Sequence, residues 1–226
     1  MPDLIACSKY LMVILGIFAG YFPVQTGMKS AGVRGVGKQL LFCFLMSAAG
    51  LSGVMIFAAL ENVISGLPVT FGAVSVCGVY LVSPLFVYLL GKLFRLKTGD
   101  AFDIFAVYVL PTLFLMRINC LMTGCCIGKM IGSTGFLWPV RETEMIFYAV
   151  MLIIFLKKSD EIHRGVKFPL LMISYGILRF FVEFFRESPS IHLLHPAHIW
   201  SMLILIFGAG ACLEIKAQKN KIRRRK

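Results

Sequence analysis

Long apolar stretches alternate with short polar connections along nearly the whole chain. The seven stretches cover residues 10–27, 39–60, 69–91, 101–116, 143–156, 168–185 and 197–213. Several of them approach the roughly 20 residues that an α-helix needs to cross the hydrocarbon core of a bilayer. The pattern predicts an all-α, polytopic integral membrane protein with about seven transmembrane helices.

The composition supports this class and excludes a soluble domain. Hydrophobic residues make up 58% of the 226 residues, charged residues only 15%, and the mean hydropathy is +0.84. A soluble domain of this length has too little interior to bury so much apolar surface. Because the sequence shows no repeat or linker, we expect one transmembrane domain over residues 1–215 and a basic cytoplasmic tail over residues 216–226. The first apolar stretch lacks a basic leader segment and an A-x-A cleavage site, so we expect it to be retained as a helix.

The net charge of +12 comes from basic residues that are unevenly placed. Clusters fall on every second connection and on the C-terminus. They comprise Lys29, Arg34, Lys38, Lys92, Arg95, Lys97, Lys157, Lys158, Arg164, Lys167 and the tail KAQKNKIRRRK. Basic residues accumulate on the cytoplasmic side of membrane proteins. The sequence therefore predicts a multi-pass protein of the cell (inner or plasma) membrane with its N-terminus outside. The tail is expected to meet anionic membrane lipid, and no nucleic-acid partner is expected.

The segment YGILRFFVEFFRE, residues 175–187, places charges inside an apolar helix. Residues three and four apart share one helix face. The residues Tyr175, Arg179, Glu183 and Arg186 therefore form one polar stripe, with phenylalanines over most of the remaining surface. An arginine at the middle of a spanning helix costs at least about 2.5–3.5 kcal/mol on insertion scales, so we expect this stripe to face protein, water or an anion.

Arg117 closes the fourth apolar stretch on the same, outer side. One interpretation is that Arg179 and Glu183 form an intrahelical pair that only stabilises the bundle. The other is that Arg117, Arg179 and Arg186 outweigh their one acidic partner, Glu183. Guanidinium groups bind phosphate in bidentate fashion, so the second interpretation predicts a phospholipid headgroup site at the outer leaflet. In the outer segment GCCIGK, Gly124 and Gly128 predict a tight non-helical loop whose N–H groups add anion contacts.

Cysteines and histidines gather on the same side. The spacing of Cys120, Cys125 and Cys126 does not specify zinc, and adjacent cysteines rarely ligate one ion with ease. A disulfide from Cys120 to either neighbour is an alternative in an oxidising exterior. Inert packing is the interpretation favoured for all three, so no metal site is expected. The histidines His192 and His195 are expected in a solvated loop, whereas His198 begins the last helix.

Two segments together resemble the signature regions of the prolipoprotein diacylglyceryl transferase family. They are RINCLMTGCCIGK and YGILRFFVEFFRE, and the segment WPVRETE is similar to a third family stretch. The matching motif positions are Arg117, Gly128, Glu144, Tyr175, Arg179, Glu183 and Arg186, with a weaker match at Tyr10. The chain departs from the family at Cys120 and Cys125, where the family has Asn and Glu. It also lacks the family histidine after the second helix, where Cys77 or a neighbour stands.

The resemblance implies transfer of a diacylglyceryl group from phosphatidylglycerol to the lipobox cysteine thiol of prolipoprotein signal peptides. No cofactor is implied. The residues expected to be catalytic are Arg117, Arg179, Glu183, Tyr175 and His198. Those expected to bind substrate are Arg117, Gly128, Glu144, Arg186 and Tyr10. The base stays open among Glu183, Glu144, Tyr175 and His198, although Glu183 is favoured as the residue that orients Arg179.

Two alternatives are kept. One is a phospholipid-binding relative with altered or lost transferase activity, which the missing histidine and asparagine motivate. The other is an anion transporter. The sequence shows neither the inverted repeat nor the matched broken helices that are typical of transporters.

Overall fold

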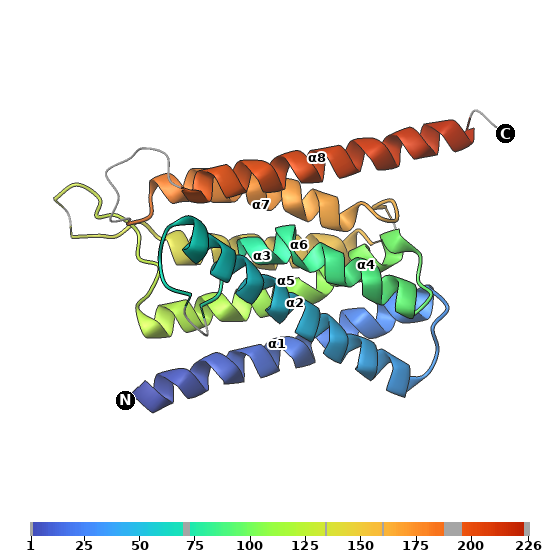
Figure 1. Ribbon diagram of the computed structural model, residues 1–226, viewed down its shortest axis with the longest axis horizontal. Coiled ribbons are helices and arrows are strands. Elements are labelled where there is room, and N and C mark those ends of the chain that lie inside the picture. Colours follow the sequence, from blue (N-terminus) through green and yellow to red (C-terminus); the bar gives the residue numbers. More distant parts are fainter. Residues whose placement is uncertain (1, 70–72, 134, 160, 188–195, 224–226) are drawn as a thin grey trace.

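The computed structural model describes residues 2–69, 73–133, 135–159, 161–187 and 196–223, with side chains described from residue 11. This part of the chain folds into eight helices (Figure 1). Their bounds are α1 Pro2–Ser30, α2 Val36–Ile64, α3 Cys77–Leu81, α4 Ser83–Leu93, α5 Thr98–Thr123, α6 Val140–Lys157, α7 Lys167–Phe184 and α8 Pro196–Arg223.

Each predicted apolar stretch falls on a helix, and the third is divided between α3 and α4. Four described helices are long and apolar enough to cross a membrane. These segments are Leu11–Ser30, Val36–Ile64, Thr98–Thr123 and Pro196–Lys221. The helices α6 and α7 have 18 residues each but carry charged side chains. The helical membrane character is confirmed, while the number of seven spans and their orientation stay predictions.

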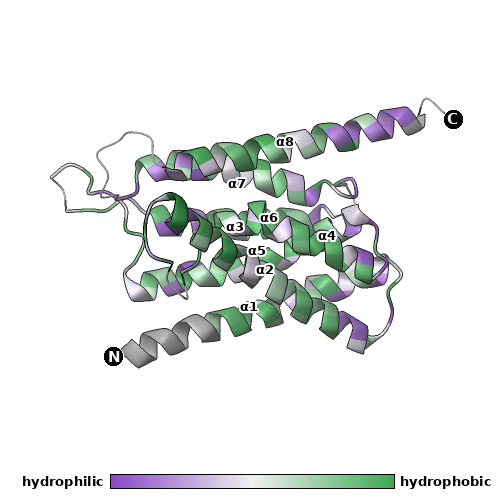
Figure 2. Cartoon of the chain, in the orientation of Figure 1, coloured by the Kyte–Doolittle hydropathy of each residue, from purple (hydrophilic) through white to green (hydrophobic). Residues whose placement is uncertain are grey.

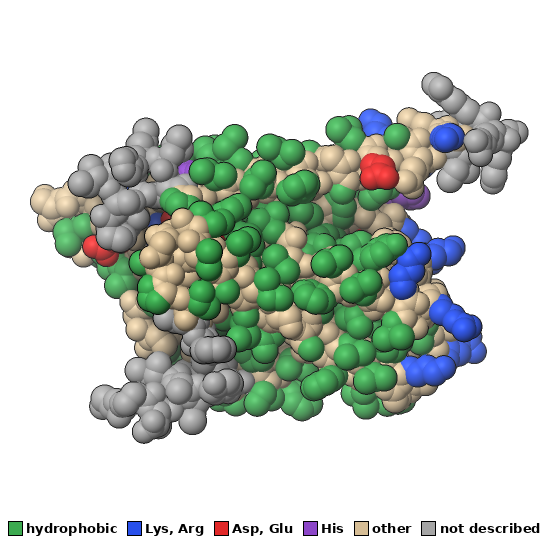
Figure 3. Space-filling model, viewed as in Figure 1, with side chains coloured by type: hydrophobic (Ala, Val, Ile, Leu, Met, Phe, Trp, Pro, Cys, Tyr) green, Lys and Arg blue, Asp and Glu red, His purple; other side chains and the backbone are tan. Residues whose placement is uncertain are grey.

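The helices lie roughly side by side and reverse direction at each connection except the one between α3 and α4, which run in the same direction (Figure 1). The α1–α2, α4–α5 and α6–α7 connections and the C-terminal end of α8 therefore lie at one end of the bundle. Lys and Arg side chains gather at that end in the space-filling view (Figure 3). Between the two ends the visible surface is largely apolar (Figures 2 and 3). We name the two ends the basic end and the opposite end.

Helix α5 lies at the centre and contacts α1, α4, α6 and α7. Small residues allow α1 to approach it closely, because a Cβ added at Gly16 would lie 2.6 Å from the hydroxyl oxygen of Thr112. Close approach through small residues is a common way for helices to pack in membranes. The hydroxyl groups of Tyr108 in α5 and Ser47 in α2 are 2.5 Å apart, which links a third helix to this contact.

One carboxylate near the basic end has a structural role. Asp103 of α5 accepts hydrogen bonds from the backbone N–H groups of Gly165, at 2.6 Å, and Lys167, at 2.9 Å. The first N–H groups of a helix have no partner within the helix, and a carboxylate is a strong acceptor for them. Asp103 therefore ties the start of α7 to the central helix and fixes the position from which α7 runs to the opposite end.

Candidate functional site

Charged side chains from three helices meet inside the opposite end of the bundle. Arg117 comes from the last turns of α5, Glu144 from the first turns of α6, and Arg179 and Glu183 from the last turns of α7. Their exposed fractions are 6%, 1%, 7% and 7%, respectively. Charges are almost never buried to this extent unless they are paired. The sequence stripe on α7 therefore faces protein, as predicted.

The charges form one continuous chain of ion pairs. Glu144 lies between two arginines, with its oxygens 2.5 Å from Nε of Arg117 and 3.1 Å from Nη1 of Arg179. The second Nη of Arg179 is 2.7 Å from the carboxylate of Glu183. That carboxylate is also 4.0 Å from a guanidinium nitrogen of Arg186, whose side chain is 25% exposed. This series of ion pairs thus leads from the buried Glu144 to the partly exposed Arg186.

The expectation that Glu183 is the one acidic partner was wrong, because Glu144 binds two of the arginines. The alternative interpretation, an isolated pair of Arg179 and Glu183, also describes only part of the arrangement, although that pair is present. Three guanidinium groups share two carboxylates, so the ion-paired chain has one more positive charge than negative charges. This surplus is smaller than the sequence predicted, but it is retained.

A tyrosine stack lines the buried side of the ion pairs. The ring of Tyr175 stacks on Tyr80, with centroids 4.3 Å apart, and lies 6.3 Å from the ring of Tyr148. The hydroxyl groups of Tyr175 and Tyr80 have no hydrogen-bond partner within the described residues. A buried hydroxyl group without a partner is costly, so these two groups are unusual in so buried a position.

The loop from Gly124 to Pro139 covers the end of α7. Gly124 adopts the left-handed conformation that ends α5, with φ of 68°, and Cys126 adopts a similar φ of 59°. The N–H of Lys129 donates to the carbonyl oxygen of Phe185 at 2.7 Å, and Gly128 pairs with Arg186 in a β-bridge. The predicted tight loop is therefore present. A side chain at Gly128 would clash with the carbonyl oxygen of Trp138, so the structure requires glycine there for packing.

This loop brings a sulfur atom to the arginines. A guanidinium nitrogen of Arg186 donates to Sγ of Cys126 at 2.9 Å, and Arg117 lies 3.9 Å from the same sulfur. A hydrogen bond with Cys120, together with the positive charges of Arg186 and Arg117, lowers the pKa of Cys126 to about 5. The two guanidinium groups therefore favour the thiolate form of Cys126. All three loop cysteines are free thiols, and Cys125 is exposed rather than packed.

The remaining predicted residues lie in other surroundings. His198 of α8 is 1% exposed, and its ring packs against those of Phe180, at 5.2 Å, and Phe184, at 4.5 Å. These phenylalanines belong to α7, so His198 packs against the same helix that carries Arg179 and Glu183. Tyr10 belongs to α1, but its side chain lies outside the described residues, as do His192 and His195 entirely.

Sequence reasoning missed Glu61. It lies near the end of α2, and both it and Cys77 of α3 interact electrostatically with Arg179. A signal was present, because Glu61 is a lone acidic residue directly after the second apolar stretch. Nothing in the sequence links that stretch to the α7 stripe, and only the packing of α2 and α3 places both near Arg179.

Comparison with known proteins points to one family. The family model described as "Prolipoprotein diacylglyceryl transferase" matches residues 8–213. The chain is 34% identical over 109 residues to phosphatidylglycerol–prolipoprotein diacylglyceryl transferase 2 of Clostridium perfringens, an alignment that covers 41% of this chain and 43% of that protein. It is 29% identical over 116 residues to the Ehrlichia ruminantium protein named phosphatidylglycerol–prolipoprotein diacylglyceryl transferase, covering 44% and 45%, respectively. The chain thus spans less than half the length of these relatives.

Proposed function

Because the chain belongs to the prolipoprotein diacylglyceryl transferase family, we propose that it transfers diacylglyceryl from phosphatidylglycerol to a cysteine thiol of a prolipoprotein signal peptide. The names of the relatives describe this reaction for those proteins. We further propose that the chain crosses the cell membrane seven times, with the basic end in the cytoplasm. The opposite end, and the ion pairs within it, would then face the outer leaflet.

One observation supports the proposal above the others, namely the buried chain of three arginines and two glutamates. In our proposal Arg117 and Arg179 hold the lipid phosphate, because guanidinium groups bind phosphate with two parallel hydrogen bonds. Arg186, which is partly exposed, adds positive charge at the rim of the site.

The chemistry requires a displacement at the carbon that carries the phosphate. The acceptor sulfur forms a bond to that carbon while the bond from carbon to phosphate oxygen breaks, and glycerol phosphate leaves with the electron pair. Negative charge therefore grows on the leaving phosphate. Arginines that are already held in place stabilise this growing charge without having to reorganise.

The glutamates hold the arginines in position. Glu144 receives two guanidinium groups and Glu183 receives Arg179, so both carboxylates are occupied by ion pairs. We therefore assign positioning to both residues and leave substrate contact to the arginines and to the free hydroxyl group of Tyr175. The positive field of the arginines also favours the thiolate form of the acceptor cysteine.

The test is an assay with labelled phosphatidylglycerol, a lipobox peptide and the full chain in proteoliposomes. The substitution Arg179→Gln is expected to lower turnover by about 100- to 1,000-fold, the loss typical of one removed charge-stabilising donor. Arg179→Lys keeps the charge but loses the bidentate geometry, so it should retain intermediate activity. Arg164→Gln is the matched control, because Arg164 is 67% exposed at the basic end.

Two outcomes would contradict the proposal. Equal turnover in Arg179→Gln and Arg164→Gln would show that the buried arginines do not act on the phosphate. Lipid binding without any thioether product from the unaltered chain would instead favour a relative that moves a different group.

A further inference from the structure

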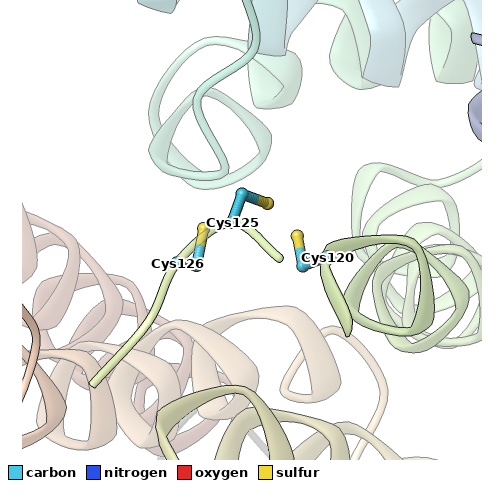
Figure 4. A group of neighbouring side chains, drawn as sticks. All are labelled: Cys120, Cys125 and Cys126. Atoms are coloured by element: carbon cyan, nitrogen blue, oxygen red, sulfur yellow. The ribbon is translucent and has the colours of Figure 1, made fainter. Parts of the chain in front are cut away.

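The three outer cysteines form a cluster that the proposed transfer reaction does not use. The Sγ atoms of Cys120, Cys125 and Cys126 all lie within 4.8 Å of one another. Figure 4 shows their side chains gathered around one space between the end of α5 and the following loop. Neither the phosphate-holding arginines nor the acceptor thiol requires three neighbouring sulfur atoms from the enzyme.

The backbone explains how two adjacent cysteines reach the same space. Successive side chains of an extended segment point in opposite directions. Here Gly124 and Cys126 both have positive φ, 68° and 59°, and this curled path turns the loop back toward Cys120. A left-handed conformation is unfavourable for a residue other than glycine, and such strain is concentrated at functional sites. The objection that adjacent cysteines rarely bind one ion therefore does not hold for this loop.

We propose that Cys120, Cys125 and Cys126 form a binding site for a soft, thiophilic metal ion such as Cu⁺ or Zn²⁺. Thiolate sulfur selects ions of this class. With metal–sulfur bonds of about 2.3 Å, three ligating sulfur atoms lie about 4 Å apart. The three sulfur atoms all lie within 4.8 Å of one another, so none is more than about 0.8 Å farther from another than that value, and small side-chain rotations complete the site.

The surrounding charges favour metal binding over a disulfide. Arg117 donates to the sulfur atoms of Cys120 and Cys126, at 3.9 Å each, and Arg186 donates to Cys126 at 2.9 Å. Three thiolates around a univalent or divalent cation keep a net negative charge, which the two guanidinium groups offset. A disulfide would leave those guanidinium groups facing uncharged sulfur atoms and would use only two of the three thiols.

The first experiment needs no substitution. The full chain is reduced in detergent, freed of reductant under argon, and titrated separately with Cu⁺, Zn²⁺ and Cd²⁺, the last as a spectroscopic probe of the zinc-type site. We expect one ion per chain after desalting and thiolate-to-metal absorption with Cd²⁺ or Cu⁺. Bound metal should protect Cys120, Cys125 and Cys126 from alkylation, as read by mass spectrometry, while alkylation of Cys212 in α8 is unchanged.

Substitutions then locate the site. Replacing a residue that only hydrogen-bonds to a metal ligand typically lowers the metal affinity by about 10- to 100-fold. Cys126→Ser and Cys120→Ser each remove a ligand itself, so we expect them to lower the metal affinity by more than about 100-fold. Cys212→Ser is the matched control and should bind as the unaltered chain does. Binding of Cu⁺ or of Zn²⁺ at the three cysteines supports the proposal and identifies the ion.

The proposal is overturned if the reduced chain retains none of the three ions and alkylates identically with and without them. It is also overturned if Cys120 resists alkylation until reductant is added, because that result identifies a disulfide. Neither outcome affects the test of the transferase reaction, whose readout is the thioether product.

Discussion

The two ends of the helix bundle contain the same types of charged residue in opposite surroundings. At the basic end, Lys158 and Glu161 form a pair 3.6 Å apart with 61% and 71% of their side chains exposed. At the opposite end, Arg117 and Glu144 form a pair with exposures of 8% and 1%. Exposed pairs contribute little because water screens them, whereas breaking a buried pair leaves a charge that nothing solvates.

The two ends therefore differ in how strictly the positions of their charged side chains matter. In the proposed function, the basic end needs only positive charge at the membrane surface, which any arrangement of lysines and arginines supplies. The opposite end, in the same proposal, needs particular atoms in particular places, because a phosphate is recognised by the directions of the guanidinium N–H bonds. Substitutions at the two ends should therefore differ sharply in effect, and the comparison can be tested by matched pairs.

The largest effect on stability is expected for Glu144→Gln, which leaves two buried arginines without their shared carboxylate. Breaking a buried ion pair from one side typically costs about 3–5 kcal/mol, measured here as the free energy of unfolding in mixed micelles with increasing denaturant. Glu161→Gln is the control at the basic end and should change that value by less than about 0.5 kcal/mol. Equal changes in the free energy of unfolding for the two substitutions would show that the buried and the exposed ion pairs do not differ in their contribution to stability.

A smaller loss is expected for Gly128→Ala. The added methyl group meets the backbone carbonyl oxygen of Trp138, which cannot rotate away as a side chain can, and overpacking of this kind costs about 1–3 kcal/mol. The control is Gly37→Ala, since nothing lies within 4 Å of a Cβ at Gly37 near the start of α2. There alanine should raise the free energy of unfolding by up to about 1 kcal/mol. A Gly128→Ala protein as stable as the unaltered chain would show that Gly128 is not packed against the Trp138 backbone as described.

The smallest effect is expected for Tyr175→Phe, which removes a hydroxyl group without a partner in the described part of the chain. Stability should change little, whereas kcat/KM should fall about fivefold, the equivalent of one neutral hydrogen bond of about 1 kcal/mol to the substrate. Tyr88→Phe is the control, because Tyr88 lies in the middle of α4 with its exposed ring 5.4 Å from the Lys92 ammonium. A loss of stability without loss of activity would assign the Tyr175 hydroxyl group to structure alone.

Part of the site could be predicted because it lies on one helix. Tyr175, Arg179, Glu183 and Arg186 are separated by three or four residues, and helical geometry alone places them on one face. The pair of Arg179 and Glu183 follows directly, at 2.7 Å. The partnership of Arg117 and Arg179 with Glu144 could not be predicted in this way, because the three residues come from three helices and their meeting depends on how α5, α6 and α7 pack.

The cysteines show the same limit. Their spacing in the sequence argued for inert packing, because adjacent side chains usually diverge. Two positive φ values turn the loop back toward α5, and the three sulfur atoms gather beside Arg117 and Arg186. The surroundings of His198 could not be predicted either, because its contacts with the rings of Phe180 and Phe184 depend on how α7 and α8 pack.

The sequence by itself determined the class of the protein, the positions of the helices and the separation of its two ends. These follow from hydropathy, length and charge, which act along the chain and depend little on what packs against what. Only the tertiary structure decided which carboxylate balances which arginine, which hydroxyl groups stay free and where the sulfur atoms meet. Those properties depend on distances of a few ångströms between side chains far apart in sequence, and electrostatic energies change steeply over such distances inside a bundle from which water is excluded.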